Sequence, residues 1–260
     1  MNRITALATT VAVAAAPLAL AMPTQAVAAK APAYTVTAKA NIDTAVAKED
    51  TVKVRGRVTP KAAGEKVVLQ QRVGNKKTWK ATGSAKIRRN GTYVLKDTPS
   101  TQGPREYRVL KPASDGIRKG FSEALAVEVY KWEKLIYRLS GPRVNVEPTG
   151  VLIGTDYFGQ SLATTNSGTP SSVEYTLGRE CTDLRATYAL TDSSATGSSG
   201  AVTVTADGAV LASHPLAVGT VIEDEVIDVS NVFRLKLDLS TSATPVAIAA
   251  VATPEVLCTR

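Results

Sequence analysis

The single histidine of this 260-residue chain, His214, is the first place to look for catalysis. Nucleophilic catalysis needs a general base, usually histidine, within hydrogen-bond reach of the nucleophile. Ser213 precedes His214, but successive side chains of a strand point to opposite faces, so this adjacency does not create a catalytic pair. We expect His214 at the surface, just beyond a strand that starts at Val210 and before a turn. The sequence therefore predicts a protein that is not an enzyme.

A contiguous acidic run, Glu223, Asp224 and Glu225, is the other candidate for chemistry. A glycosidase needs two carboxylates that face each other across a cleft, with the pKa of one raised. Neighbours in sequence splay to alternate sides, so we expect this run in a solvated loop, while a facing pair formed by other acids stays open. Calcium is conceivable here or near Asp156, but neither stands in a spaced calcium-loop signature. We predict no metal and no cofactor.

The two cysteines, Cys181 and Cys258, are predicted to form a disulfide. An oxidising exterior favours pairing, whereas a cytosolic chain keeps its thiols free. Closing a loop of this length restricts the unfolded chain by about 4 to 5 kcal/mol in the entropic model. The alternative is two buried free thiols. Two thiols with one distant histidine do not make a zinc site.

Sugar binding without catalysis uses an aromatic face against the sugar ring and a few polar groups that fix the hydroxyls. Tyr175 and Tyr188 fall in register with apolar strand positions, so we expect them in the core. The stretch from Pro148 to Ser172 is rich in Gly, Pro, Thr and Ser, which predicts long surface loops. Within it, adjacent aromatic residues cannot both point inward. The predicted ligand-binding residues are Asp156, Tyr157 and Phe158.

Basic residues gather in the middle of the N-terminal half. They are Lys76, Lys77, Lys80, Lys86, Arg88 and Arg89. This patch could meet anionic wall polymers or lipid head groups electrostatically. Charged edge strands also prevent aggregation, and this is the interpretation we favour. Nucleic acid is not an expected partner, because the basic residues are not interleaved with aromatic ones and, as the N-terminal residues indicate below, we expect the chain to be exported.

Residues 1–28 have the pattern of a secretory signal peptide. Arg3 precedes an apolar run from Ile4 to Ala21, and small residues at 26–29 provide an Ala-x-Ala cleavage site. No later segment approaches the roughly 20 apolar residues that a spanning helix needs. We expect a secreted protein, extracellular or associated with the cell wall, without a membrane span.

The charge divides the chain into two parts. Residues 30–140 hold 24 Lys or Arg against 10 Asp or Glu, a net of +14, whereas residues 141–260 hold 6 against 13, a net of −7. About 230 mature residues exceed the usual size of one domain. We expect two domains, at 34–130 and 132–260, which either have different partners or attract each other.

The first domain shows period-two alternation throughout, which predicts seven strands and a β-sandwich. Asn90-Gly91 lies between two such runs, so Ala85 to Lys96 is predicted to be a hairpin with a type I′ turn. Motifs such as Val-Arg-Gly-Arg-Val-Thr-Pro, Val-Val-Leu-Gln-Gln-Arg, Gly-Thr-Tyr-Val-Leu and Ala-Val-Glu-Val-Tyr resemble the immunoglobulin-like repeats of exported bacterial surface proteins. The resemblance covers residues 34–130 and implies a fold more than a function. Trp79 is expected to cap the sandwich core.

The second domain is predicted to hold eight or more strands in a jelly roll, with Leu135, Tyr137 and Leu139 alternating in the first. Asp207-Gly208 predicts a second hairpin, and Ser230-Asn231 predicts a turn. The later alternating apolar positions are Val226, Phe233, Leu235, Leu237 and Leu239, then Val246 and Ile248.

A second resemblance covers residues 132–260. Gly-Thr-Asp-Tyr, Val-Glu-Tyr-Thr-Leu-Gly, Leu-Arg-Ala-Thr-Tyr-Ala-Leu-Thr-Asp, Phe-Arg-Leu-Lys-Leu-Asp-Leu and Ala-Thr-Pro-Glu-Val-Leu are similar to the NPCBM family of carbohydrate-binding modules often attached to glycoside hydrolases. It implies a galactose-binding-like β-sandwich and suggests sugar recognition. No hydrolase domain accompanies the module here.

The sequence thus predicts an all-β, exported, non-catalytic protein that binds glycan or an anionic cell-envelope polymer through its C-terminal module. The alternative is a structural or adhesive surface protein that contacts another protein and has no sugar recognition. A glycoside hydrolase is a third hypothesis.

Overall fold

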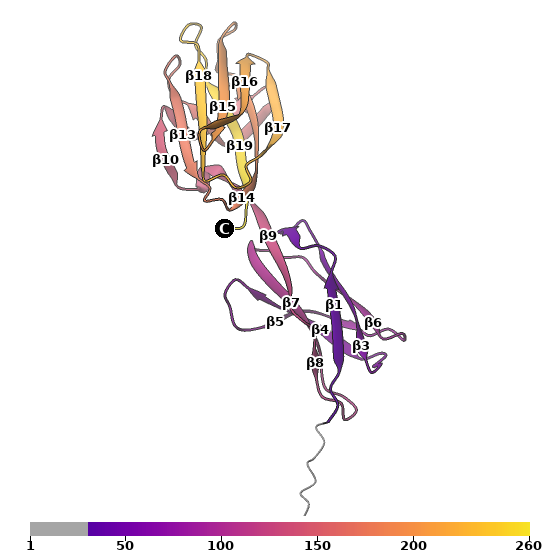
Figure 1. Ribbon diagram of the computed structural model, residues 1–260. Coiled ribbons are helices and arrows are strands. Elements are labelled where there is room, and N and C mark those ends of the chain that lie inside the picture. The colour runs from indigo at the N-terminus through magenta and orange to yellow at the C-terminus, as the bar shows by residue number, and fades with distance from the viewer. Residues whose placement is uncertain (1–30) are drawn as a thin grey trace, which may run out of the picture. The chain divides into compact units, whose positions relative to one another are not determined.

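The computed structural model describes residues 31–260, and this part of the chain is all-β, as predicted (Figure 1). The predicted signal peptide, residues 1–28, lies outside the described residues. Neighbouring strands pair antiparallel, except for a short parallel pair between β2 and β9.

The N-terminal half contains two sheets. Its strands are β1 (Thr35–Ala40), β2 (Thr44–Val46), β3 (Val52–Thr59), β4 (Lys66–Val73), β5 (Lys80–Lys86), β6 (Thr92–Asp97), β7 (Gly103–Lys111), β8 (Gly120–Phe121) and β9 (Leu125–Lys134). One sheet has the order β1-β3-β6, while β5, β4, β7 and β9 are neighbours in the other, with β8 beside β7. Alternate side chains from both sheets, such as Val54 and Val109, meet in one buried cluster that spans residues 34–129.

The turn at Asn90 forms, but the predicted hairpin does not. Gly91 has a φ of +83°, and its N–H donates to the Arg88 carbonyl over 2.8 Å. Asn90 is not among the residues with positive φ, so the type I′ prediction is wrong. The strands on either side also separate, because β5 pairs with β4 and β6 pairs with β3.

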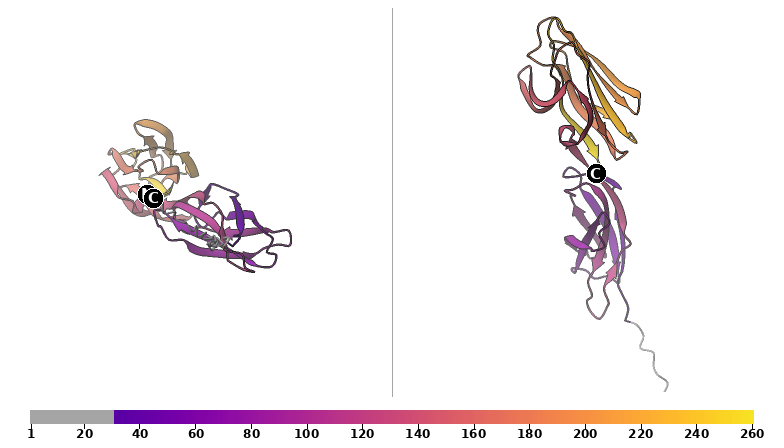
Figure 2. Two further views of the ribbon diagram at one scale, coloured as in Figure 1. Left: turned by 60° about the horizontal axis from the view of Figure 1, so that its bottom comes forward. Right: turned by 90° about the vertical axis from the view of Figure 1, so that its left-hand side faces the viewer.

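The C-terminal half also contains two groups of strands. They are β10 (Ser140–Val144), β11 (Val146–Ile153), β12 (Asp156–Thr164), β13 (Ser171–Thr176), β14 (Cys181–Leu190), β15 (Ser199–Ala206), β16 (Ala209–Ala217), β17 (Val221–Asp228), β18 (Arg234–Thr241) and β19 (Ala249–Cys258). A five-stranded sheet has the order β10-β13-β18-β15-β16, and the orange and yellow strands in Figures 1 and 2 include its β15, β16 and β18. β11, β12, β19, β14 and β17 pair in that order. The main buried cluster spans residues 135–258 and contains the predicted core residues Tyr175 and Tyr188.

The hairpin predicted at Asp207-Gly208 is confirmed. β15 and β16 pair from Ala206 and Ala209 outward, and both turn residues have positive φ, +47° and +89°. This is the conformation of a type I′ turn, whose twist matches that of the strands. The turn at Ser230-Asn231 is also confirmed, with Asn231 at a φ of +61°.

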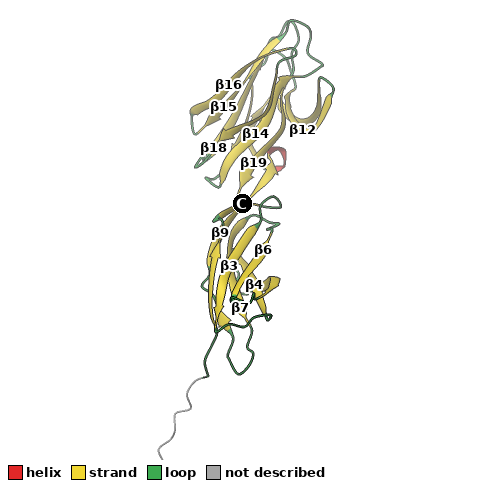
Figure 3. Ribbon diagram, turned by 90° about the vertical axis from the view of Figure 1, so that its right-hand side faces the viewer, coloured by secondary structure: helices red, strands yellow, loops and turns green. Residues whose placement is uncertain are grey.

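Two further predictions for this half are wrong. Residues 135–137 form a single 3-10 turn, η1 (Leu135–Tyr137), in place of a strand; it is the one helix in the described residues and is red in Figure 3. Leu135 is buried, while Tyr137 and Leu139 are exposed. Leu235, Leu237 and Leu239 are buried as predicted. The second wrong prediction concerns the rest of that apolar series, because Val226, Phe233 and Val246 are exposed.

β9 is continuous across the predicted domain boundary. Its residues 125–129 pair with β7, and its residues 131–134 pair with β19. The boundary expected between residues 130 and 132 therefore falls within a strand.

Candidate functional site

Tyr157 lies in a strand rather than in a long loop. The stretch predicted as loops forms most of the β11 and β12 hairpin, in which Leu152 pairs with Tyr157 and Gly154 turns the chain with a φ of +62°. The register shifts between Thr149 and Val151, where the single residue Gly150 of β11 lies opposite two residues of β12, Gly159 and Gln160, so the bulge adds a residue to β12. The loop prediction failed because Gly and Pro are typical of loops but are also tolerated in bulged edge strands.

The ring of Tyr157 packs over Gly150 and is largely open to solvent. A Cβ at Gly150 would lie 2.0 Å from the Tyr157 hydroxyl oxygen, so the absence of a side chain there makes room for the ring. The residue is 70% exposed. One ring face is therefore held by the backbone of its own hairpin, while the side chain remains accessible to a ligand.

The three predicted ligand-binding residues do not share one site. Phe158 faces away from Tyr157 and packs against a small third cluster that contains Val151, Ala189 and Ala250. Asp156 is exposed at the start of β12, opposite Ile153. The prediction that one of two adjacent aromatic residues must be exposed is confirmed, because Tyr157 points outward while Phe158 is partly buried.

Tyr157 lines a depression of about 800 Å³. Polar side chains from three segments surround it, including Glu147, Thr149, Thr165, Asp192 and Ser193. The Asp192 carboxylate accepts a 2.8 Å hydrogen bond from the Gly154 N–H, which ties the hairpin turn to the loop after β14. An exposed aromatic ring beside hydroxyl and carboxylate groups is the combination that sugar recognition uses.

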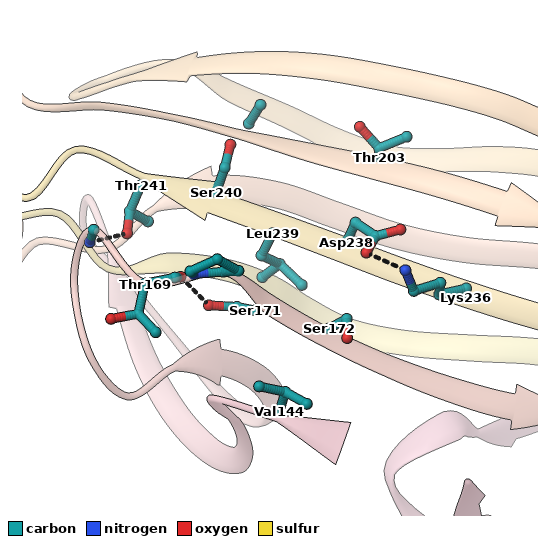
Figure 4. Close-up of a pocket in the computed structure, with 13 residues that line it drawn as sticks. Val144, Thr169, Ser171, Ser172, Thr203, Lys236, Asp238, Leu239, Ser240 and Thr241 are labelled. Carbon is teal, nitrogen blue, oxygen red and sulfur yellow. Dashed lines mark hydrogen bonds and ion pairs between the residues drawn. The ribbon is translucent and has the colours of Figure 1, made fainter. Parts of the chain in front are cut away.

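A second depression, of about 580 Å³, lies on the outer face of the five-stranded sheet (Figure 4). Ser172, Thr203, Asp238 and Ser240 line it and alternate with buried residues of the same strands. Lys236 and Asp238, two positions apart on β18, form an ion pair of 2.6 Å along one side of it. Sequence reasoning missed this groove, although the period-two alternation already placed these polar residues on one face. It contains no aromatic side chain, so it lacks the platform that Tyr157 offers.

His214 is in a strand and largely covered, contrary to the prediction of a surface residue before a turn. It lies within β16, its Nε2 is 2.7 Å from Glu225 Oε2, and its ring stacks on Tyr188 at 5.0 Å. Ser213 points to the other face and bonds the Thr203 hydroxyl, so His214 and Ser213 do not form a catalytic pair. Burial, and secondarily the charge of Glu225, raises the pKa of the Tyr188 hydroxyl.

The acidic run belongs to strand β17 and not to a loop. Asp224 has a φ of +44° where β17 bulges against β14, and its N–H is hydrogen-bonded to the Thr187 hydroxyl. Glu225 turns toward His214, while Glu223 is exposed. Asp224 is exposed as well, so Glu225 alone of the three is partly buried. Within residues 31–260, no group of three or more His, Cys, Asp or Glu side chains is arranged to hold a metal ion.

The predicted basic residues divide between the two ends of β5. Lys76, Lys77 and Lys80 lie before or at its start, whereas Lys86, Arg88 and Arg89 lie at its end or in the following turn, and all six are exposed. β5 pairs only with β4, which makes it an edge strand.

Trp79 does not cap the core, and that prediction is wrong. It precedes β5 and is partly exposed, with the guanidinium carbons of Arg72 and Arg108 at 4.8 Å and 4.2 Å from its ring centroid. The Trp79 ring packs against these cations on the outer face of the sheet. Alternation could not predict this position, because Trp79 precedes the strand.

The predicted disulfide is confirmed. Cys181 and Cys258 are directly opposite each other in β14 and β19, with an S–S distance of 1.99 Å. Both residues are buried in the main C-terminal cluster. In the described part of the chain, no helix has the length and apolar character needed to cross a membrane.

Comparison with known proteins adds no family to this description. No protein-family model matches the sequence, and a search of curated proteins gives no match. A function for this protein must therefore be inferred from the geometry of its sites.

Proposed function

We propose that residues 34–130 and 132–260 form two β-sandwich modules, the first immunoglobulin-like and the second a jelly roll of the galactose-binding-like type. Two separate buried clusters, over residues 34–129 and 135–258, support this division, and each receives side chains from more than one group of paired strands. The NPCBM resemblance provides the more specific suggestion for the second module.

The protein acts outside the cell as a non-catalytic glycan-binding protein, with the Tyr157 depression as its binding site. The observation that carries this proposal is the exposed Tyr157 ring held over Gly150 beside Asp192, Thr149 and Glu147. Such a ring covers an apolar sugar face, and the surrounding oxygens accept hydrogen bonds from sugar hydroxyls. The Cys181–Cys258 disulfide is consistent with an oxidising compartment.

A second candidate function is adhesion to another protein without sugar recognition. Edge strands β16 and β17 expose apolar side chains, including Val210, Leu211, Val221 and Val226. Exposed apolar groups on neighbouring edges favour contact with another protein surface.

A glycan array with the mature chain tests the first candidate. We expect saturable binding that Tyr157→Ala weakens by about tenfold, because truncation removes the aromatic platform. Tyr137→Ala is the matched control, since Tyr137 is equally exposed, at 71%, and lies outside the depression. Equal losses in both variants, or no binding to any glycan, would contradict the proposal.

Two other results would assign a different function. Capture of a specific protein that Val210→Asp or Val226→Asp prevents, without glycan binding, would favour the adhesive protein. Release of reducing sugar from a polysaccharide would show that the protein is a glycoside hydrolase.

A further inference from the structure

A row of alternating cations and aromatic rings lies on the N-terminal half. Its contacts run from Arg72 to Trp79, then to Arg108, Phe121 and Lys119. Arg108 is the centre of the row, with its guanidinium carbon 4.2 Å from the Trp79 centroid and 4.4 Å from the Phe121 centroid. We call these five residues the Arg108 row.

The sheet positions the row on its outer face. Arg72 is in β4, Arg108 is in β7 and Phe121 is in β8, while Trp79 leads into β5. Buried residues such as Leu69 and Val109 occupy the alternate positions of β4 and β7, so the row points away from the core. Four separate segments therefore bring its members together.

Arg108 is held in place but not neutralised. Its Nε donates a 2.9 Å hydrogen bond to Gln70 Oε1, the residue opposite it in β4. Among the described residues, neither of its two terminal nitrogens has a hydrogen-bond or ion-pair partner. Partial burial lowers the pKa of Arg108, and the charge of Arg72 lowers it further, so the site carries a positive charge that its surroundings disfavour.

The neighbouring charges leave a net positive surface. Glu106 pairs with Arg72 and so neutralises one end of the row. A depression of about 640 Å³ continues from there and is lined by Lys76 and Lys77, together with Asp43 and Glu128. At the other end, Lys119 lies 5.7 Å from the Phe121 centroid.

We propose that the Arg108 row is a binding site for the oxyanions of an extended anionic polymer, either carboxylate or phosphate groups, with Arg108 as the principal contact. A guanidinium fixed by rings and by Gln70 presents its terminal N–H groups in a planar fork, which matches the two oxygens of such a group. Lys119 on one side, and Lys76 and Lys77 beside Asp43 and Glu128 on the other, offer further cations for other groups of the same polymer. This site is separate from the Tyr157 depression and does not depend on the glycan-binding proposal.

Calorimetric titration of the mature chain tests the site with three probes: polygalacturonate, inorganic polyphosphate and neutral dextran. We expect binding to at least one anionic polymer and none to dextran. The comparison of the two anionic probes shows which oxyanion is preferred. Absence of binding to both would overturn the proposal.

The variants separate this site from a diffuse electrostatic attraction. Arg108→Gln should weaken binding by about tenfold, whereas Arg88→Gln, which removes the same charge from an exposed turn, should change it less than about threefold. Trp79→Ala retains every charge but removes the ring that holds Arg108, so it should also weaken binding. Equal effects of Arg108→Gln and Arg88→Gln, with none from Trp79→Ala, would show a diffuse field and overturn the assignment.

A folding control completes the experiment. Thermal unfolding of each variant shows whether the sheet survives the substitution. Arg108→Lys provides a second measurement if Arg108→Gln does not fold, because lysine keeps the charge but lacks the planar fork. Wild-type affinity in a folded Arg108→Lys variant would contradict recognition by the guanidinium.

Discussion

Lys111 is a buried cation that the fold satisfies completely. Its side chain is 1% exposed, and its Nζ donates to Glu65 Oε2 and to the Pro112 carbonyl, both at 2.7 Å, and to the Ser114 hydroxyl at 3.0 Å. The Tyr34 ring covers it at 4.1 Å. Because a buried charge without partners is costly, each of these contacts is expected to matter for stability.

Removal of the Lys111 counter-charge should therefore destabilise the protein. We expect Glu65→Ala to lower the free energy of unfolding by about 3 to 5 kcal/mol, because it leaves a buried ammonium unpaired. Glu174→Ala is the matched control, since it removes the more exposed pair with Arg234 and should cost less than about 1 kcal/mol. Urea denaturation at pH 7 measures both, and similar losses would contradict the special role of Glu65.

The same pair should make stability depend on pH. The hydrogen bond from Lys111, followed by that from Ser114, lowers the pKa of Glu65 from its ordinary value of 4.5. A lowered folded-state pKa means that this stabilisation is present above pH 4.5 and is lost as pH falls through the folded-state value. The difference in melting temperature between wild type and Glu65→Ala should shrink in acid. A constant difference from pH 7 to pH 2 would argue against this linkage.

At the scale of elements, β3 approaches β1 closely at Gly56. A Cβ there would lie 1.7 Å from the Thr37 carbonyl oxygen and 2.5 Å from the Tyr93 hydroxyl. That hydroxyl donates a 2.5 Å hydrogen bond to the same carbonyl, so the missing side chain permits the contact between sheet strands β1 and β6. We expect Gly56→Ala to cost at least about 1 to 3 kcal/mol.

Gly83 provides the control for Gly56. It lies within β5, and the nearest atom to an added Cβ is 3.5 Å away, so Gly83→Ala should be nearly neutral. Chemical denaturation of both variants measures the difference. Equal stability of the two would show that the β1 and β3 contact relaxes without cost.

The hairpin of β11 and β12 should control the Tyr157 ring. Gly150→Ala forces the ring away from β11, so we expect it to reduce glycan binding to the level of Tyr157→Ala. Gly159→Ala is the matched variant, because its added Cβ would lie 3.4 Å from Tyr157 Cε1 and requires only a small shift. The array distinguishes them, and normal binding by Gly150→Ala would show that the ring position is unimportant.

At the scale of the whole molecule, the two main buried clusters lie in different halves of the chain and the disulfide lies in only one of them, so we expect substitutions in the two halves to have different effects on stability. The disulfide joins residues separated by 77 positions, all within the C-terminal half. We expect the Cys181→Ala, Cys258→Ala double variant to destabilise this half by about 4 kcal/mol in the chain-entropy description.

Calorimetry can show whether the halves unfold separately. If they do, the cysteine variant should lower one thermal transition and Gly56→Ala should lower the other. A single transition that both variants lower equally would indicate that β9 couples the halves into one cooperative unit. That result would also contradict the proposed division into two modules.

The sequence by itself determined the features that depend on near neighbours or on a small set of possible partners. Alternation predicted most strands, and Asp207-Gly208 specified a hairpin turn because both residues can adopt positive φ. The two cysteines had only each other to pair with. Sequence also indicated that Tyr157 and Phe158 could not both be buried, whereas the structure showed that they lie in a strand and that Tyr157 is the exposed one.

The tertiary structure decided what depends on distant segments. It assigned β5 and β6 to different sheets, although a turn joins them, because strand pairing is chosen by long-range register as well as by the turn. It placed Trp79 between Arg72 and Arg108, and His214 against Glu225. These contacts join residues on different strands, and alternation fixes only the face on which a side chain lies, not the neighbour that it meets there.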